Sequence, residues 1–314
     1  MPRLIGCALL AATAVAFSTP PTLLAQWLHY PTPGIPRTPD GKPDLMAATP
    51  RTPGGKPDFS GMWLTADGMT CEERDNRFLE CGAELPFSRY GVDINKGVPG
   101  GLPYRSETLE IVKKRMAEEG KDDPHARCLP DTFLRSYGLP HIHKIIQLPN
   151  LLVVLNEDKA SYRQVFVDGR TLPDDPNPAW NGYSSARWDG DTLVIESAGF
   201  RDDLWLDVAG NFITSAARIR ERISRPSFGY LLIEATVDDP KAYTRPWTIN
   251  LRQKIVVDTE LIEEICLENE KSSERMRGNT APSEPGAGAG PQAAVTTETA
   301  MWPIASPSSR RHSP

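Results

Sequence analysis

The sequence is poor in the residues and motifs that carry metal or nucleotide chemistry. It holds 5 cysteines and 5 histidines among 314 residues, and no two cysteines follow a Cys-x-x-Cys spacing. Thiolate zinc sites usually show that spacing, so we expect no metal site of this kind. The glycine-rich fingerprints of phosphate and dinucleotide binding are also missing. The sequence therefore predicts no cofactor.

Long apolar runs are missing too, apart from one near the start. Residues 4–17 carry no charge and follow Arg3, and small residues come after them. This order is typical of a secretory signal, and the run is too short to span a bilayer. We expect residues 1–25 to be a signal peptide cleaved after Ala25, with cleavage after Ala16 or an uncleaved anchor as alternatives. The protein is then periplasmic or secreted, with no transmembrane segment once the signal is removed.

An excess of basic charge is absent. The chain has 35 Lys and Arg against 41 Asp and Glu, a formal net charge of -6. An acidic chain repels phosphate backbones, so nucleic acid is not expected as a partner.

Export makes disulfides expected among the cysteines that follow the signal. These are Cys71, Cys81, Cys128 and Cys266, and four cysteines allow three connectivities. The closeness of the first two favours Cys71–Cys81, which leaves Cys128–Cys266. The sequence alone does not exclude the other two pairings.

Segments of different composition divide the chain. A duplicated segment, PRTPDGKPDL at 36–45 and PRTPGGKPDF at 50–59, is too rich in Pro and Gly for helix or strand, so residues 26–57 are expected to be an extended lead-in. Residues 58–270 are expected to form a single β-rich domain with one helix near 107–119. The polar residues 271–314 are expected to be disordered.

Short β runs with period-2 alternation follow the predicted helix. There are nine, from IHKIIQL at 142–148 to WTINLRQKIVV at 247–257 and LIEEICLE at 261–268, and turn residues separate them. Close spacing of this kind favours an antiparallel meander that closes into a barrel, with a β-sandwich as the alternative.

Two neighbouring acidic residues, Asp189 and Asp191, flank Gly190 between two such runs, SSARWDG and DTLVIES. Asp-Gly at this place is a strong signal of a hairpin turn, because a type I′ turn needs positive φ at both central residues. The turn accounts for these aspartates, so they do not indicate catalysis.

Residues 180–200, WNGYSSARWDGDTLVIESAGF, resemble the hallmark W-x-G-H-S-x-G-R-W-[DE]-G-D-T-L-V of a family of uncharacterised exported bacterial proteins. DPHARCLPD, RIRERISR, DDPKAYTRPW and EEICLEN fit the same family, so the resemblance spans about residues 122–270. It implies export but no activity. The chain departs from the family at Tyr183, where the family has histidine, at Ala186, and in NFITSA, where it often has Pro-His-Ser.

DFSGMW at 58–63 resembles the lipocalin signature, in which a Gly-x-Trp opens an up-and-down barrel. Trp63 would then close one end of the barrel. Together with the β runs, this resemblance makes a lipocalin-like barrel the expected fold.

Polar residues that share an apolar face indicate where a barrel would hold its chemistry. Glu221 alternates with isoleucines and Arg163 with valines, so both are expected to point inward and pair. Such a pair either specifies the fold, anchors a ligand or supplies a catalytic acid. We expect Arg163 and Glu221 to contribute to a ligand site with Trp188, Tyr183 and Trp63.

His141 and His143 are placed as a metal pair would be, with Glu157 as a third donor, but solvated histidines are the commoner outcome and no metal site is expected. The leading functional hypothesis is a binding protein for a small apolar molecule. The alternatives are a hydrolase or isomerase using an inward carboxylate, and a structural envelope-associated protein with a solid barrel; whether the chain is an enzyme is left open.

Overall fold

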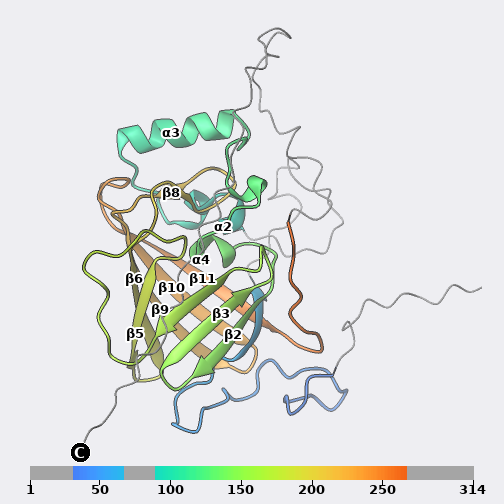
Figure 1. Ribbon diagram of the computed structural model, residues 1–314. Coiled ribbons are helices and arrows are strands. Elements are labelled where there is room, and N and C mark those ends of the chain that lie inside the picture. Colours follow the sequence, from blue (N-terminus) through green and yellow to red (C-terminus); the bar gives the residue numbers. More distant parts are fainter. Residues whose placement is uncertain (1–30, 67–88, 267–314) are drawn as a thin grey trace, which may run out of the picture. The chain divides into compact units, whose positions relative to one another are not determined.

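A computed structural model describes residues 31–66 and 89–266, and these form a closed β-barrel. Around the barrel the strands follow the order β1-β11-β10-β9-β6-β5-β4-β3-β2 (Figure 1). Their bounds are β1 Gly61–Thr65, β2 His143–Leu148, β3 Leu151–Asn156, β4 Tyr162–Phe166, β5 Tyr183–Asp189, β6 Thr192–Ala198, β9 Arg218–Ser227, β10 Tyr230–Asp238 and β11 Trp247–Val256. The barrel is the predicted fold, and the sandwich alternative is wrong.

Almost all neighbouring strands pair antiparallel, as a meander requires. Closure comes from β1, where Met62 pairs with Lys144 of β2 and with Val256 of β11. The exception is the pair β4 and β5, which run parallel and are joined through Val165–Ser184 and Phe166–Ser185 alone. The strands β7 (Leu204–Trp205) and β8 (Phe212–Ile213) form a separate two-stranded sheet between β6 and β9 in the chain.

Alternating burial explains why these segments become strands. In β11 every second residue from Trp247 to Ile255 is buried, and β9 and β10 follow the same period. The turn between β5 and β6 has Gly190 at φ +60°, as the Asp-Gly signal predicts. Its aspartates lie at the surface, where Asp189 pairs with Arg222 and Asp191 with Arg51.

Short helices gather at one end of the barrel (Figure 1). The predicted helix is α3, Ser106–Ala117, where Arg115 stacks on the rings of Trp205 and Phe212 at 4.5 and 4.6 Å. The others are α2 (Arg89–Val92), α4 (Phe133–Ser136) and the 3-10 turns η2 (Ile94–Gly97) and η3 (His125–Arg127). Among the described residues, no helix is long and apolar enough to cross a membrane.

Both copies of the duplicated segment in the lead-in fold into the same hydrogen-bonded turn, here called a clip. Thr38 donates to the Lys42 carbonyl and Thr52 to that of Lys56, both at 2.8 Å. The Arg of each clip then pairs with a barrel aspartate, Arg37 with Asp258 and Arg51 with Asp191. The described part of the lead-in, residues 31–57, is therefore attached to the barrel.

The segment LIEEICLE is not a strand, because its described part makes a single parallel bridge, between Glu264 and Asp158. The strand that completes the barrel is β1 instead. Cys266 in this segment forms a disulfide with Cys128, with an S–S distance of 2.07 Å. The predicted pair Cys71–Cys81, the signal peptide and the tail 271–314 lie outside the described residues.

Candidate functional site

A groove opens in the barrel wall beside the parallel strands β4 and β5. Its volume is about 450 Å³, and it is lined by Pro130, residues 159–164, Phe166 and residues 179–184. The strands are joined there by only two residue pairs, so the wall is not sealed by a continuous hydrogen-bond ladder. Asn181 bridges the gap, because its Nδ2 donates to the Tyr162 carbonyl oxygen at 3.1 Å.

Aromatic side chains form the walls of this groove. Tyr162 is 64% exposed, and Phe166, Trp180 and Tyr183 line the same space. The guanidinium of Arg201 stacks on Trp180 at 4.8 Å, which fixes the indole from outside the groove. The outer face continues apolar toward β2, where Ile146 and Leu148 are 38% and 48% exposed. An apolar or planar molecule would find matching surface here.

The floor of the groove is polar and belongs to a buried network. Arg163 and Ser184 line the groove, and both side chains are almost fully buried. Arg163 donates to Ser184 Oγ at 3.1 Å and to Ser197 Oγ at 3.0 Å, and it forms an ion pair with Glu221. Tyr137 Oη donates to Glu221 at 3.0 Å. Every donor and acceptor of the pair thus has a partner, as a buried charge requires.

The barrel interior behind this floor is occupied by protein. The helix α4 and the residue after it place Phe133 and Tyr137 there, and the Arg163 guanidinium lies 3.5 Å from the Phe133 ring centre. Burial raises the pKa of Tyr137 above its usual value, and the neighbouring Glu221 carboxylate acts in the same direction. Tyr137 is therefore a hydrogen-bond donor at neutral pH.

The predicted ligand residues fall in two places. Arg163 and Tyr183 line the groove, and Glu221 lies directly behind Arg163. Trp63 is fully buried and donates from Nε1 to the Phe59 carbonyl, while Trp188 packs on Phe59 with ring centres 5.5 Å apart. Trp63 and Trp188 therefore both contact Phe59, and neither lines the groove.

Sequence reasoning did not find Tyr162, Asn181 or Lys159 as part of a site. The exposed side of the alternating run SYRQVFV could have indicated Tyr162. No local signal indicates Asn181 or Lys159, because their positions depend on the long segment between β4 and β5 and on the turn after β3.

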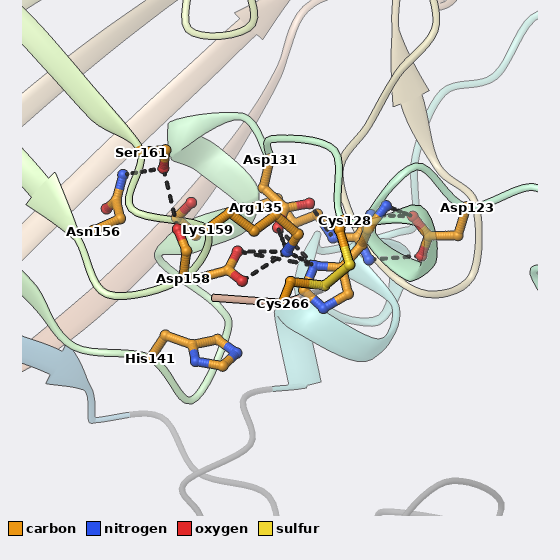
Figure 2. Close-up of polar contacts among 12 residues, drawn as sticks. Asp123, Cys128, Asp131, Arg135, His141, Asn156, Asp158, Lys159, Ser161 and Cys266 are labelled. Carbon is orange, nitrogen blue, oxygen red and sulfur yellow. Dashed lines mark hydrogen bonds and ion pairs between the residues drawn. A yellow bond between two sulfur atoms is a disulfide. The ribbon is translucent and has the colours of Figure 1, made fainter. Parts of the chain in front are cut away.

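A second polar cluster adjoins the groove at Lys159 (Figure 2). The Lys159 ammonium lies 2.6 and 2.8 Å from the two Asp158 oxygens, 3.2 Å from Asp131 Oδ2 and 2.8 Å from His125 Nδ1. Lys159 adopts φ +54°, a left-handed conformation that non-glycine residues rarely take. Its ammonium thus lies among side-chain atoms of His125, Asp131 and Asp158 that could otherwise coordinate a metal ion.

Neighbouring charges hold this cluster together. Arg135, which is 1% exposed, makes a bidentate pair with Asp123 at 2.7 Å and lies 3.2 Å from Asp131. Burial opposes ionisation of Asp131, but the charges of Arg135 and His125 bring its pKa below the usual range. Burial and the adjacent Asp131 raise the pKa of Asp158 to about 6. His141, at the edge of the cluster, has its pKa lowered by burial.

His141 and His143, which are two residues apart in the sequence, lie in different environments. His143 points into the barrel, where it is 2% exposed and packs on the Tyr137 ring. Burial lowers its pKa to about 4, so its imidazole is neutral at pH 7. His141 stays outside, 3.2 Å from Glu264, and Glu157 accepts a hydrogen bond from the Ile142 amide instead of facing the histidines.

In comparisons with known proteins, neither a protein-family model nor a curated protein matches the chain.

Proposed function

We propose that the protein binds a small, largely apolar molecule in the groove between β4 and β5. The observation that carries the proposal is the combination of aromatic walls with a buried polar floor in one opening of the barrel wall. A volume of about 450 Å³ lies within the usual range for small-molecule sites, roughly 300–1,000 Å³. The site therefore lies in the wall of the barrel rather than at its centre.

The polar groups of the groove suggest one feature of the ligand. Among the described residues, Asn181 Oδ1 is a buried oxygen with no hydrogen-bond partner. A buried acceptor left unpaired costs about 1–3 kcal/mol, which a ligand hydroxyl or amine would offset. Arg163 and Ser184 already have protein partners, so we assign them to shaping the floor. The proposed ligand is thus apolar with one hydrogen-bond donor.

An enzyme using an inward carboxylate is less well supported. Glu221 is 0% exposed, and Arg163 and Tyr137 both donate to its oxygens. A general acid or base must reach the proton that it transfers. The oxygens of Glu221 are instead hydrogen-bonded to other buried protein groups. The occupied interior also supports a structural role for the barrel. Ligand binding in the groove would distinguish a binding protein from a structural protein.

Export is part of the proposal. The apolar start of the chain has the form of a secretory signal, and the disulfide Cys128–Cys266 suits an oxidising compartment. We therefore propose a periplasmic or secreted binding protein, and the hallmark around residues 180–200 supports membership of the exported family that it resembles.

A fluorescence titration with N-phenyl-1-naphthylamine, an apolar dye with one N–H donor, tests the binding site. We expect saturable 1:1 binding. Tyr162→Ser and Trp180→Ala should each raise the Kd about tenfold, equivalent to about 1.4 kcal/mol. Tyr230→Ser is the matched control, because Tyr230 packs with Arg252 on β10 and β11, across the barrel order from β4. Binding that ignores both groove variants, or that Tyr230→Ser weakens equally, would refute the proposal.

A further inference from the structure

Three chain segments meet beside the disulfide and bring together donors that are far apart in the sequence. His141 precedes β2, Asp158 follows β3, and Glu264 lies two residues before Cys266. The backbone fixes their positions, because Glu264 N donates to the Glu157 carbonyl at 3.0 Å and Asp158 and Glu264 form a parallel bridge. The disulfide secures the end of the last segment. Main-chain contacts therefore hold the backbones of Asp158 and Glu264 side by side.

The donor atoms are close enough together to bind one ion. His141 Nδ1 lies 3.2 Å from Glu264 Oε2. One donor atom from each of His141, Asp158 and Glu264 lies within 4.8 Å of the other two. Two atoms bound at about 2.1 Å to one tetrahedral ion are roughly 3.4 Å apart. The histidine and glutamate therefore already have about the separation that a bound ion requires, and the Asp158 donor atom lies within 4.8 Å of both.

The charges in this part of the chain leave room for a cation. Arg135 pairs with Asp123 and lies 3.2 Å from Asp131, while Lys159 contacts the carboxylates of Asp131 and Asp158. Lys159 already fills the neighbouring group of His125, Asp131 and Asp158, which makes that group a poor site for a free ion. Glu264 lies on the other side of Asp158, beside His141, and its side chain is 46% exposed. The open side is thus accessible to an ion from solvent.

We propose that His141, Asp158 and Glu264 bind a divalent transition-metal ion, with Zn²⁺ the best match. One imidazole and two carboxylates form a donor set that Zn²⁺ accepts, and three protein ligands leave a position for water. Asp158 also bonds to Lys159, so the lysine orients the carboxylate from the far side of the site. Because Lys159 also lines the groove, the metal site and the groove are neighbours, but neither depends on the other.

Isothermal titration of the chelator-treated full chain with Zn²⁺ at pH 7 tests this site. We expect one ion per chain to bind, with at least tenfold weaker binding in His141→Ala and in Glu264→Gln. Glu263→Gln is the matched control, because this neighbouring glutamate is exposed and lies outside the donor group, and it should bind like the parent chain. His125→Ala should also leave the affinity unchanged.

A second readout separates loss of the site from loss of the fold. Zn²⁺ should raise the melting temperature of the parent chain and of Glu263→Gln, but not that of Glu264→Gln, whose exposed side chain makes the variant well tolerated. Absence of Zn²⁺ binding by the parent chain would overturn the proposal. So would an affinity for Zn²⁺ that is unchanged from the parent chain in folded Glu264→Gln and His141→Ala, since other residues would then be the ligands.

Discussion

Arg163 on β4 and Glu221 on β9 form an ion pair inside the barrel, although β5 and β6 separate their strands in the sheet. The guanidinium reaches both intervening strands, because it donates to Ser184 of β5 and Ser197 of β6. One side chain thus links four neighbouring strands, and it does so under the floor of the groove. The pair joins the stability of the barrel to the shape of the proposed site.

Removing one member of this pair should be far worse than removing both. Glu221→Leu leaves the Arg163 charge buried without its carboxylate, which should lower the free energy of unfolding by about 3–5 kcal/mol. Arg163→Met combined with Glu221→Leu should recover at least half of that loss, because no unpaired charge remains. Urea denaturation of the parent chain, the single variants and the double variant measures the coupling. Additive losses would show that the pair does not act as a unit.

Ionisation of the buried Asp207 should lower its contribution to the stability of the fold as pH rises from about 4 to about 7. This residue is fully buried, and burial raises its pKa from 3.8 to about 7, with the nearby Asp93 acting in the same direction. Its oxygens accept hydrogen bonds from the Ile94 amide and from Asn211, and the charge of Arg135 lies near. A raised pKa means that the folded state prefers the protonated acid. Its contribution is complete below about pH 4 and is lost as pH passes 7.

Asp207→Asn separates this effect from other titrating groups. The variant should flatten the decline of unfolding free energy between pH 5 and pH 7 by up to about 1.4 kcal/mol per pH unit, even if it is less stable overall. Asp158, with its pKa raised to about 6, acts in the same direction, and His143, with its pKa lowered to about 4, acts in the opposite direction; both remain in both proteins. Denaturation curves with identical slopes against pH would contradict the assignment to Asp207.

The sequence predicts those features that depend on neighbouring residues. Strand alternation placed Arg163 and Glu221 inside, and the Asp-Gly pair placed the turn at Gly190. It could not place Phe133 and Tyr137 in the barrel, because α4 is a single turn with no periodic pattern to read. The parallel pairing of β4 and β5, which creates the groove, is also set by the long connection between them rather than by either strand.

The disulfide Cys128–Cys266 should contribute strongly to stability, because it closes a loop with a sequence separation of 138. In the chain-entropy model a loop of this size is worth about 4–5 kcal/mol. Cys128→Ser with Cys266→Ser should lower the unfolding free energy by about that amount, measured by urea denaturation under oxidising conditions. Adding a reductant should then destabilise the parent chain by more than it destabilises the double variant. Equal effects of the reductant would show that this bridge contributes little.

Adding a single methyl group at Gly229 should detach the lead-in from the barrel. A Cβ at this position would lie 2.5 Å from Leu45 Cβ and 2.8 Å from the Leu45 carbonyl oxygen, where Gly229 N now donates to that oxygen. Gly229→Ala should therefore speed proteolysis within residues 31–50 severalfold, with a smaller effect on barrel unfolding. Met46→Ala is the control, because its side chain is 76% exposed. Unchanged cleavage in Gly229→Ala would show that the lead-in does not depend on this contact.

The three aromatic residues of the predicted ligand site lie in two places. The sequence predicts that Trp63, Trp188 and Tyr183 share a ligand site, and of these three Tyr183 lines the groove. Alternation tells which side of a strand a tryptophan faces, yet it does not tell which end of the barrel it reaches. Trp188 stacks near the lead-in, with the Lys56 ammonium 5.6 Å from its ring, and this contact comes from a segment that no strand pattern includes.

Indole N–H resonances in a ¹⁵N-resolved NMR titration with N-phenyl-1-naphthylamine test the binding site most directly. Trp180 lines the groove, whereas Trp63 and Trp188 mark the alternative location near Phe59. The account predicts that the dye shifts the Trp180 resonance saturably and leaves those of Trp63 and Trp188 in place. Shifts confined to Trp63 and Trp188, with Trp180 unmoved, would contradict it.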